Sequence, residues 1–146
     1  MNSKETLFAL LSLDIDQSRN AANEIIYSNN STLTEYYIPY LDKINIAISK
    51  IPAPTTRYVR DPRHSIWLAK KILNTVAQGK CRCSEYLSSD LLLPEELEKH
   101  NLVTIKIKED IPWTPAYECE CTDCKQMYRV VENHNYHYPW SRWRKI

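Results

Sequence analysis

Cysteines are the residues of this sequence best suited to chemistry, and they lie in two tight groups. They are Cys81, Cys83, Cys119, Cys121 and Cys124. Thiolates spaced one or two residues apart are typical zinc ligands, and zinc prefers four of them in a tetrahedron. An odd number of clustered cysteines does not suit the even, dispersed disulfide framework of a secreted protein. The pattern therefore predicts a metal site in a reducing compartment, and we expect a cytoplasmic protein.

The predicted zinc ligands are Cys81, Cys83, Cys121 and Cys124. Cys119 is an alternative to Cys121, because two residues separated by one position share a face of a strand. Two other interpretations remain open: five reduced core thiols without a metal, or a redox or disulfide role. Four thiolates leave no open coordination position, so the zinc is expected to be structural rather than catalytic.

A zinc site with three cysteines is a further alternative, because His134 and His137 lie close in sequence and one of them could complete it. The favoured interpretation of both is as surface or sheet histidines. Residues 81–134 resemble a zinc ribbon, in which two short cysteine turns are joined by a long loop. Lys125 stands where the ribbon usually has glycine, and the first cysteine pair has one spacer residue instead of two.

The first 80 residues show helical periodicity. We expect a helix over Glu5–Leu13 capped by Ser3, with Leu7, Phe8 and Leu11 on one apolar face. Asp16 is expected to cap a second helix that continues to about residue 26. A third is predicted to begin at residue 31 or 32 and to reach residue 50, with a kink or break at a proline in position 39.

The most regular predicted helix leads directly to the first cysteine pair. Asp61 suits the cap and Pro62 the first helical position. Gly79 is the only glycine in the chain, and it falls where a helix end needs a left-handed residue. Cys81 and Cys83 follow at once, so this helix end is expected to position them.

After residue 100 the period changes to two, which predicts strands. The strand candidates, preceded by a short helix over Pro94–His100, are Leu102–Lys108, Tyr117–Glu120, Met127–Glu132 and Tyr136–Trp143. We therefore predict an α+β fold: a helical N-terminal bundle packed on a small antiparallel sheet with a four-cysteine zinc knuckle. The expected regions are residues 1–80 and 81–146, within one compact domain.

No catalytic motif stands out. The sequence has no nucleophile elbow, no H-E-x-x-H helix and, with one glycine, no phosphate-binding glycine loop. No apolar stretch approaches the roughly 20 residues that cross a bilayer, and the N-terminus lacks the basic flank of a signal peptide. We expect a non-enzymatic protein with no membrane segment.

Charge is segregated along the chain although the net charge is only +1. Residues 50–82 hold eight basic groups and one acidic group, whereas residues 83–123 hold three basic and ten acidic groups. Basic groups interleaved with tryptophan could bind nucleic acid through phosphate contacts and base stacking. The residues concerned are Arg57, Arg60, Arg63, Lys70, Lys71, Lys80, Arg82, Trp140, Arg142, Trp143, Arg144 and Lys145. Alternatively, the tryptophans close the core of the sheet.

The C-terminal segment resembles another class of protein. Three of its stretches are similar to the C-terminal region of small bacterial immunity proteins of polymorphic toxin (contact-dependent inhibition) systems. They are Tyr117-Glu-Cys-Glu-Cys-Thr-Asp-Cys124, Tyr128-Arg-Val-Val-Glu132 and Tyr136-His-Tyr-Pro-Trp-Ser-Arg-Trp143. The resemblance implies a cytoplasmic protein that neutralises a toxin domain by direct binding. Zinc-dependent nucleic-acid binding, which is based on the basic and tryptophan residues above, is the alternative function.

Many such toxins are basic nucleases, for which the acidic block of residues 83–123 offers a complementary surface. The candidate contact residues are Glu95, Glu96, Glu98, Glu109 and Asp110. The alternative for each of them is a position on an ordinary solvated face.

Overall fold

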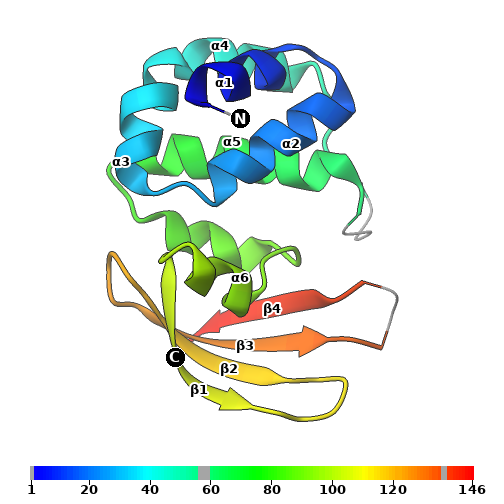
Figure 1. Ribbon diagram of the computed structural model, residues 1–146, viewed down its shortest axis with the longest axis vertical. Helices are drawn as coiled ribbons and strands as arrows, with labels where there is room; N and C mark the ends of the chain where they lie inside the picture. The colour runs from blue at the N-terminus through cyan, green and yellow to red at the C-terminus, as the bar shows by residue number, and fades with distance from the viewer. Residues whose placement is uncertain (1, 56–59, 136–137) are drawn as a thin grey trace. The chain divides into compact units, whose positions relative to one another are not determined.

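The computed structural model describes residues 2–55, 60–135 and 138–146. It divides into two compact units, Met1–Arg82 and Cys83–Ile146. The first unit is helical and the second contains an antiparallel sheet (Figure 1). The predicted α+β class is confirmed. Within the described residues, no helix combines the length and the apolarity needed to cross a bilayer.

The helical unit is built around α5, which packs against α2 and α4. Its elements are α1 (Ser3–Leu11), α2 (Ile15–Ile26), α3 (Asn30–Thr32), the π-helix η1 (Leu33–Tyr37), the 3₁₀-helix η2 (Ile38–Tyr40), α4 (Leu41–Ser49) and α5 (Pro62–Ala77). Figure 1 shows α2 and α5 side by side. Their facing side chains, among them Ile25, Ile66 and Ile72, are fully buried. Apolar burial of this kind stabilises the bundle.

Two helix caps differ from the sequence prediction. Asn2, not Ser3, caps α1: its Oδ1 accepts from the Glu5 backbone N–H at 2.9 Å, and the Glu5 side chain completes a capping box. Asp14, not Asp16, caps α2 by accepting from the Gln17 N–H at 2.9 Å. In both cases the helix begins earlier than expected, which leaves the predicted cap inside the first turn.

The predicted apolar face of α1 is only partly correct. Leu10 is fully buried, while Leu7 and Leu11 are half-buried and Phe8 is 68% exposed. Thr6, rather than a large apolar residue, fills the other buried position of this helix.

The break expected at Pro39 is confirmed. The chain passes through π-helix η1 and 3₁₀-helix η2 before regular α-helix resumes at Leu41. Proline has no N–H to donate to the carbonyl four residues earlier, so an uninterrupted α-helix is not available here.

The described part of the sheet unit contains two short helices and four strands. Its elements are η3 (Arg82–Ser88), α6 (Pro94–Lys99), β1 (Val103–Glu109), β2 (Ala116–Cys121), β3 (Met127–Asn133) and β4 (Trp140–Lys145). The strands form an antiparallel meander in the order β1-β2-β3-β4 (Figure 1). The predicted helix before the sheet is α6, which packs on β1.

One face of the sheet holds the core of this unit. Trp143 is buried and donates its indole N–H to the Leu92 carbonyl at 3.0 Å. Tyr86 and Tyr128 pack edge-on against it, with ring centroids 5.2 and 5.6 Å away. The expectation that the C-terminal tryptophans close the core is correct for Trp143, whereas Trp140 is only half-buried.

Strand details depart from the simple alternation. The register shifts between Ile105 and Ile107, so Ile107 is 50% exposed instead of sharing the buried face of Val103. Such a bulge re-aims the side chains that follow it. β4 begins at Trp140, later than predicted. The expected start at Tyr136 lies outside the described residues.

Candidate metal centre

Four cysteine sulfurs meet at one point of the structure. The Sγ atoms of Cys81, Cys83, Cys121 and Cys124 all lie within 4.8 Å of one another. All five cysteines of the chain are free thiols. The sequence prediction that these four lie together is confirmed.

The spacing of the sulfurs suits a tetrahedral metal. A zinc–sulfur bond of about 2.3 Å in a regular tetrahedron places the sulfurs about 3.8 Å apart. The Cys83 and Cys124 sulfurs are 3.4 Å apart, and no pair in the group exceeds 4.8 Å. A disulfide requires about 2.05 Å. The four sulfurs are therefore spaced for a shared ion and not for pairwise bonding.

The first cysteine pair follows a tightly closed helix end. Gly79 has φ +75°. It donates its N–H to the Val76 carbonyl at 3.0 Å, and Lys80 donates to Thr75 at 3.1 Å. These two bonds form a Schellman motif, which satisfies carbonyls at the end of α5 and turns the chain. Cys81 follows directly, as the sequence predicted.

Arg82, between the two cysteines, fixes the backbone of this segment. It is 1% exposed. Its guanidinium donates to the Ser28 carbonyl at 2.5 Å and to the Ile26 carbonyl at the end of α2. A cation at a helix C-terminus is favourable because carbonyl dipoles point at it. Arg82 is thus buried and engaged, which removes it from the proposed phosphate contacts.

The second cysteine pair occupies the turn from β2 to β3. Cys121 donates its N–H to the Gln126 carbonyl at 2.9 Å, and Lys125 donates to the Cys121 carbonyl at 3.0 Å. Lys125 has φ +66°, in the left-handed region that favours glycine. It therefore adopts the backbone conformation of the glycine that zinc ribbons usually have here.

The exposure of the four cysteines differs across the site. Cys83 and Cys121 are 3% and 1% exposed, Cys81 is half-buried and Cys124 is exposed. A hydrogen bond with Cys121, together with burial, raises the pKa of the Cys83 thiol far above its usual value. The thiol group is accordingly neutral without a metal, and metal binding would release protons.

Tyr128 supports the cluster from the core. Its hydroxyl donates to the Cys83 sulfur at 3.0 Å and is 3.3 Å from the Cys83 carbonyl oxygen. Burial, followed by the bond to Cys83, raises the pKa of this phenol, so it stays a donor. Hydrogen bonds of this kind orient metal ligands and tune their charge. Sequence reasoning missed Tyr128, although its cross-strand register with Cys119, two residues from Cys121, points to it.

Cys119 lies outside the group of four. It is completely buried, and burial, with Cys121 and Glu98 nearby, raises its pKa to about 12. It therefore behaves as a neutral core thiol. Among the described residues, the cysteine group includes no histidine. His134 Nε2 instead lies 3.0 Å from the Glu132 carboxylate. His137 is outside the described residues.

Of the five acidic residues predicted as contacts, Glu96 is half-buried and the others are exposed, and each is already bonded within the unit. Glu95 lies 2.8 Å from Lys108, which also lies 3.4 Å from Asp110. Glu96 pairs with Lys99 at 3.0 Å, and Glu109 with Arg129 at 3.3 Å. Glu98 accepts from the Ile105 backbone N–H at 2.7 Å. The bond from Lys108 lowers the pKa of Glu95 below its usual range.

The residues predicted to bind nucleic acid differ in exposure and in their bonding partners. Arg63 is held by Asp61 at 2.6 Å, and the Lys70 ammonium lies 4.5 Å from the Trp67 ring centroid. Trp143 is buried, whereas Arg142 and Arg144 are exposed. Arg57 lies outside the described residues. Within the described residues, the basic groups of this set are divided between the two units.

Comparisons of the chain with protein-family models, with curated proteins and with solved structures give no match.

Proposed function

We propose that the four clustered cysteines bind one structural zinc ion. The observation that carries this proposal is the convergence of four sulfurs within 4.8 Å from two well-defined turns. All-thiolate sites select zinc over harder cations such as magnesium and calcium. The coordination is closed, so the ion contributes folding free energy rather than a reactive position.

Elemental analysis of the purified chain tests the zinc site, in parallel with a thiol titration before and after denaturation. We expect about one zinc per chain, since four thiolates fill one coordination sphere. Cys124→Ser should lose the metal, while Cys119→Ala should retain it. A metal-free wild-type protein with five reactive thiols would refute the site. Equal zinc contents in the two variants would refute the ligand assignment.

We further propose that the chain is a non-catalytic binding protein and, from the resemblance of its C-terminal segment, an immunity protein that neutralises a toxin domain. The exposed acidic groups of α6 and of the end of β1 support a basic partner. Glu95, Glu109 and Asp110 have side chains 52%, 45% and 83% exposed. Their internal ion pairs are surface pairs, each worth no more than about 1 kcal/mol, so a cationic partner can displace them.

Toxin neutralisation is tested by growth. A partner captured with the purified chain must arrest cells when expressed alone and be harmless when coexpressed with this chain. Charge reversal at Glu109 and Asp110 should restore toxicity, whereas reversal at Glu24 on α2 should not. A partner that is harmless alone, or protection that survives the reversal, would contradict the proposal.

Nucleic-acid binding is the second candidate function, and one observation favours it. Arg142 lies 5.0 Å from the Trp140 ring centroid, and Arg144 follows two residues later on the same face of β4. A stacked ring flanked by cations can bind single strands. Titration with a labelled oligonucleotide at two salt concentrations decides: salt-sensitive binding that Arg142→Ala weakens supports it, and no binding at low salt rejects it.

A further inference from the structure

The helical unit carries an apolar surface strip that its own core does not use. Five large apolar side chains of the unit are 45–68% exposed: Phe8, Leu13, Tyr36, Tyr40 and Ile46. Single exposed apolar residues need no explanation. These five are different because all of them line two adjoining hollows beside α1.

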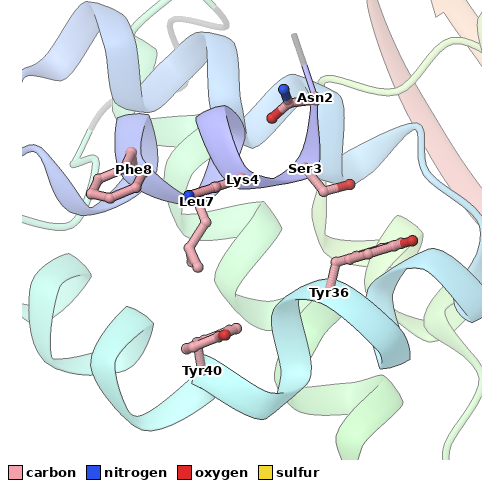
Figure 2. Close-up of a pocket in the computed structure, with 7 residues that line it drawn as sticks. All are labelled: Asn2, Ser3, Lys4, Leu7, Phe8, Tyr36 and Tyr40. Carbon is pink, nitrogen blue, oxygen red and sulfur yellow. The ribbon is translucent and has the colours of Figure 1, made fainter.

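The larger hollow lies between α1 and the segment η1–η2, and has a volume of about 660 Å³. Figure 2 shows Leu7 extending from α1 toward Tyr40, while Tyr36 projects from the same facing segment one turn earlier. The smaller hollow, about 210 Å³, is lined by Leu11 and Leu13 together with Ile46. Leu7 and Leu11 are one helical turn apart, so the two hollows lie along the same side of α1 and together are called the groove.

Irregular backbone presents the tyrosines of this groove. Tyr36 lies in π-helix η1 and Tyr40 ends 3₁₀-helix η2. A π-turn inserts an extra residue into a helix and is found frequently at functional sites. The break in regular α-helical geometry therefore falls on the two tyrosines that line the groove.

Charge along the groove has one sign. Lys4 lines the larger hollow, and Lys43 and Lys50 line the smaller one, while no carboxylate is among the described lining residues of either. Across the described part of the chain, none of these three lysines forms an ion pair. By contrast, Lys99 and Lys108 in the sheet unit are paired with glutamates. The groove thus offers apolar contact flanked by unneutralised cations.

We propose that this groove is a docking site for an amphipathic helix of a partner protein whose apolar stripe is flanked by acidic residues. Helix α1 has nine residues and is therefore about 13 Å long, or two and a half turns. This length can accommodate a partner helix whose apolar anchors lie at positions i, i+3 or i+4, and i+7. The three lysines select an acidic rather than a basic helix. The groove lies wholly within residues 2–50, so its lining includes none of the proposed zinc ligands or toxin contacts.

The test selects 16-residue peptides from a random display library on the full-length wild-type chain. Selected binders should share helical apolar spacing and carry a net negative charge. Phe8→Ala and Ile46→Ser should each weaken their affinity at least about tenfold, as expected for interface anchors. Trp113→Ala is the matched control, because Trp113 is as exposed as Phe8 (67% against 68%) but lies in the sheet unit. Its affinity should stay within about twofold of wild type.

A charge pair of variants separates electrostatic selection from simple stickiness. Lys43→Glu should abolish the preference for acidic peptides, whereas Lys71→Glu, at an exposed position on α5 outside the groove, should leave it intact. Binders that are basic or unpatterned would overturn the proposal, as would binders that ignore Phe8 and Ile46, or no binders at all. Vesicles of phosphatidylcholine and phosphatidylglycerol provide the alternative occupant. Phe8-dependent binding to them without peptide binding would assign the groove to a membrane surface and overturn the proposal.

Discussion

Tyr128→Phe isolates the contribution of one hydrogen bond to the proposed metal site. The substitution removes the hydroxyl that donates to the Cys83 sulfur at 3.0 Å and leaves the ring in place against Trp143. A hydrogen bond to a charged group is worth about 1.5–3 kcal/mol, against about 0.5–1.5 kcal/mol for a neutral pair. Metal binding converts the neutral Cys83 thiol to a thiolate, so the bond strengthens by about 1–1.5 kcal/mol on binding. Zinc affinity should therefore fall about tenfold.

The assay is a competitive titration of zinc with a chromophoric chelator. Tyr117→Phe is the matched control. Tyr117, on β2, is buried like Tyr128, but its hydroxyl donates to the Glu95 carboxylate at 3.3 Å and not to a cysteine sulfur. This control should change the zinc dissociation constant by less than about twofold, although it also loses a hydrogen bond. An unchanged zinc affinity in Tyr128→Phe would refute the reasoning, as would an equal loss in both variants.

Three further predictions concern the backbone that positions the cysteines. Asp61→Ala should destabilise the helical unit by about 1 kcal/mol through loss of the α5 cap, and Asp61→Asn should retain most of that stability in a thermal melt. The bond from Arg63 lowers the pKa of Asp61. The stability that the ionised Asp61 contributes is therefore fully present above the carboxyl pKa of the unfolded chain and is lost as pH falls through the folded pKa. A stability difference between wild type and Asp61→Asn that grows toward acidic pH would contradict this. Gly79→Ala should cost about 1–2 kcal/mol because of the φ of +75°, and an unchanged melting temperature would show that the helix end relaxes. Lys125→Gly should stabilise the sheet unit by up to about 1 kcal/mol, whereas Lys125→Ala should not, since only glycine removes the left-handed penalty at φ +66°.

The sequence contains enough local information to predict most elements and the cysteine group. Pro62, Asp61 and Gly79 each have one strong positional preference, and the structure places all three as expected. Each cysteine pair is recognisable as a ligand pair from its spacing of one or two residues. Local chemistry of this kind needs no knowledge of the tertiary structure.

The missed features depend on long-range pairing. Ile107 appears to continue an alternating strand, and only the register of β1 against β2 introduces the bulge that exposes it. Phe8 belongs to an apolar helical face, yet no described neighbour covers it, and a helical pattern cannot say which part of its face is used. Tyr128 is an ordinary strand residue until pairing brings it to Cys83. Arg82 resembles a surface cation until the end of α2 is found to accept its hydrogen bonds.

Metal removal should act unequally on the two units. The sheet unit, Cys83–Ile146, is below the roughly 70–80 residues at which a single hydrophobic core is usually sufficient, and such small units are commonly stabilised by a metal or by disulfides. All five cysteines are free, so the proposed metal would be the cross-link in place of a disulfide. The helical unit has its own core of fully buried residues such as Leu10, Ile25 and Ile72. A strong chelator should therefore abolish the near-ultraviolet circular dichroism of Trp143 packing while most far-ultraviolet helical signal remains. Simultaneous loss of both signals would show that the units unfold together, and retention of both would show that the sheet unit does not need the metal.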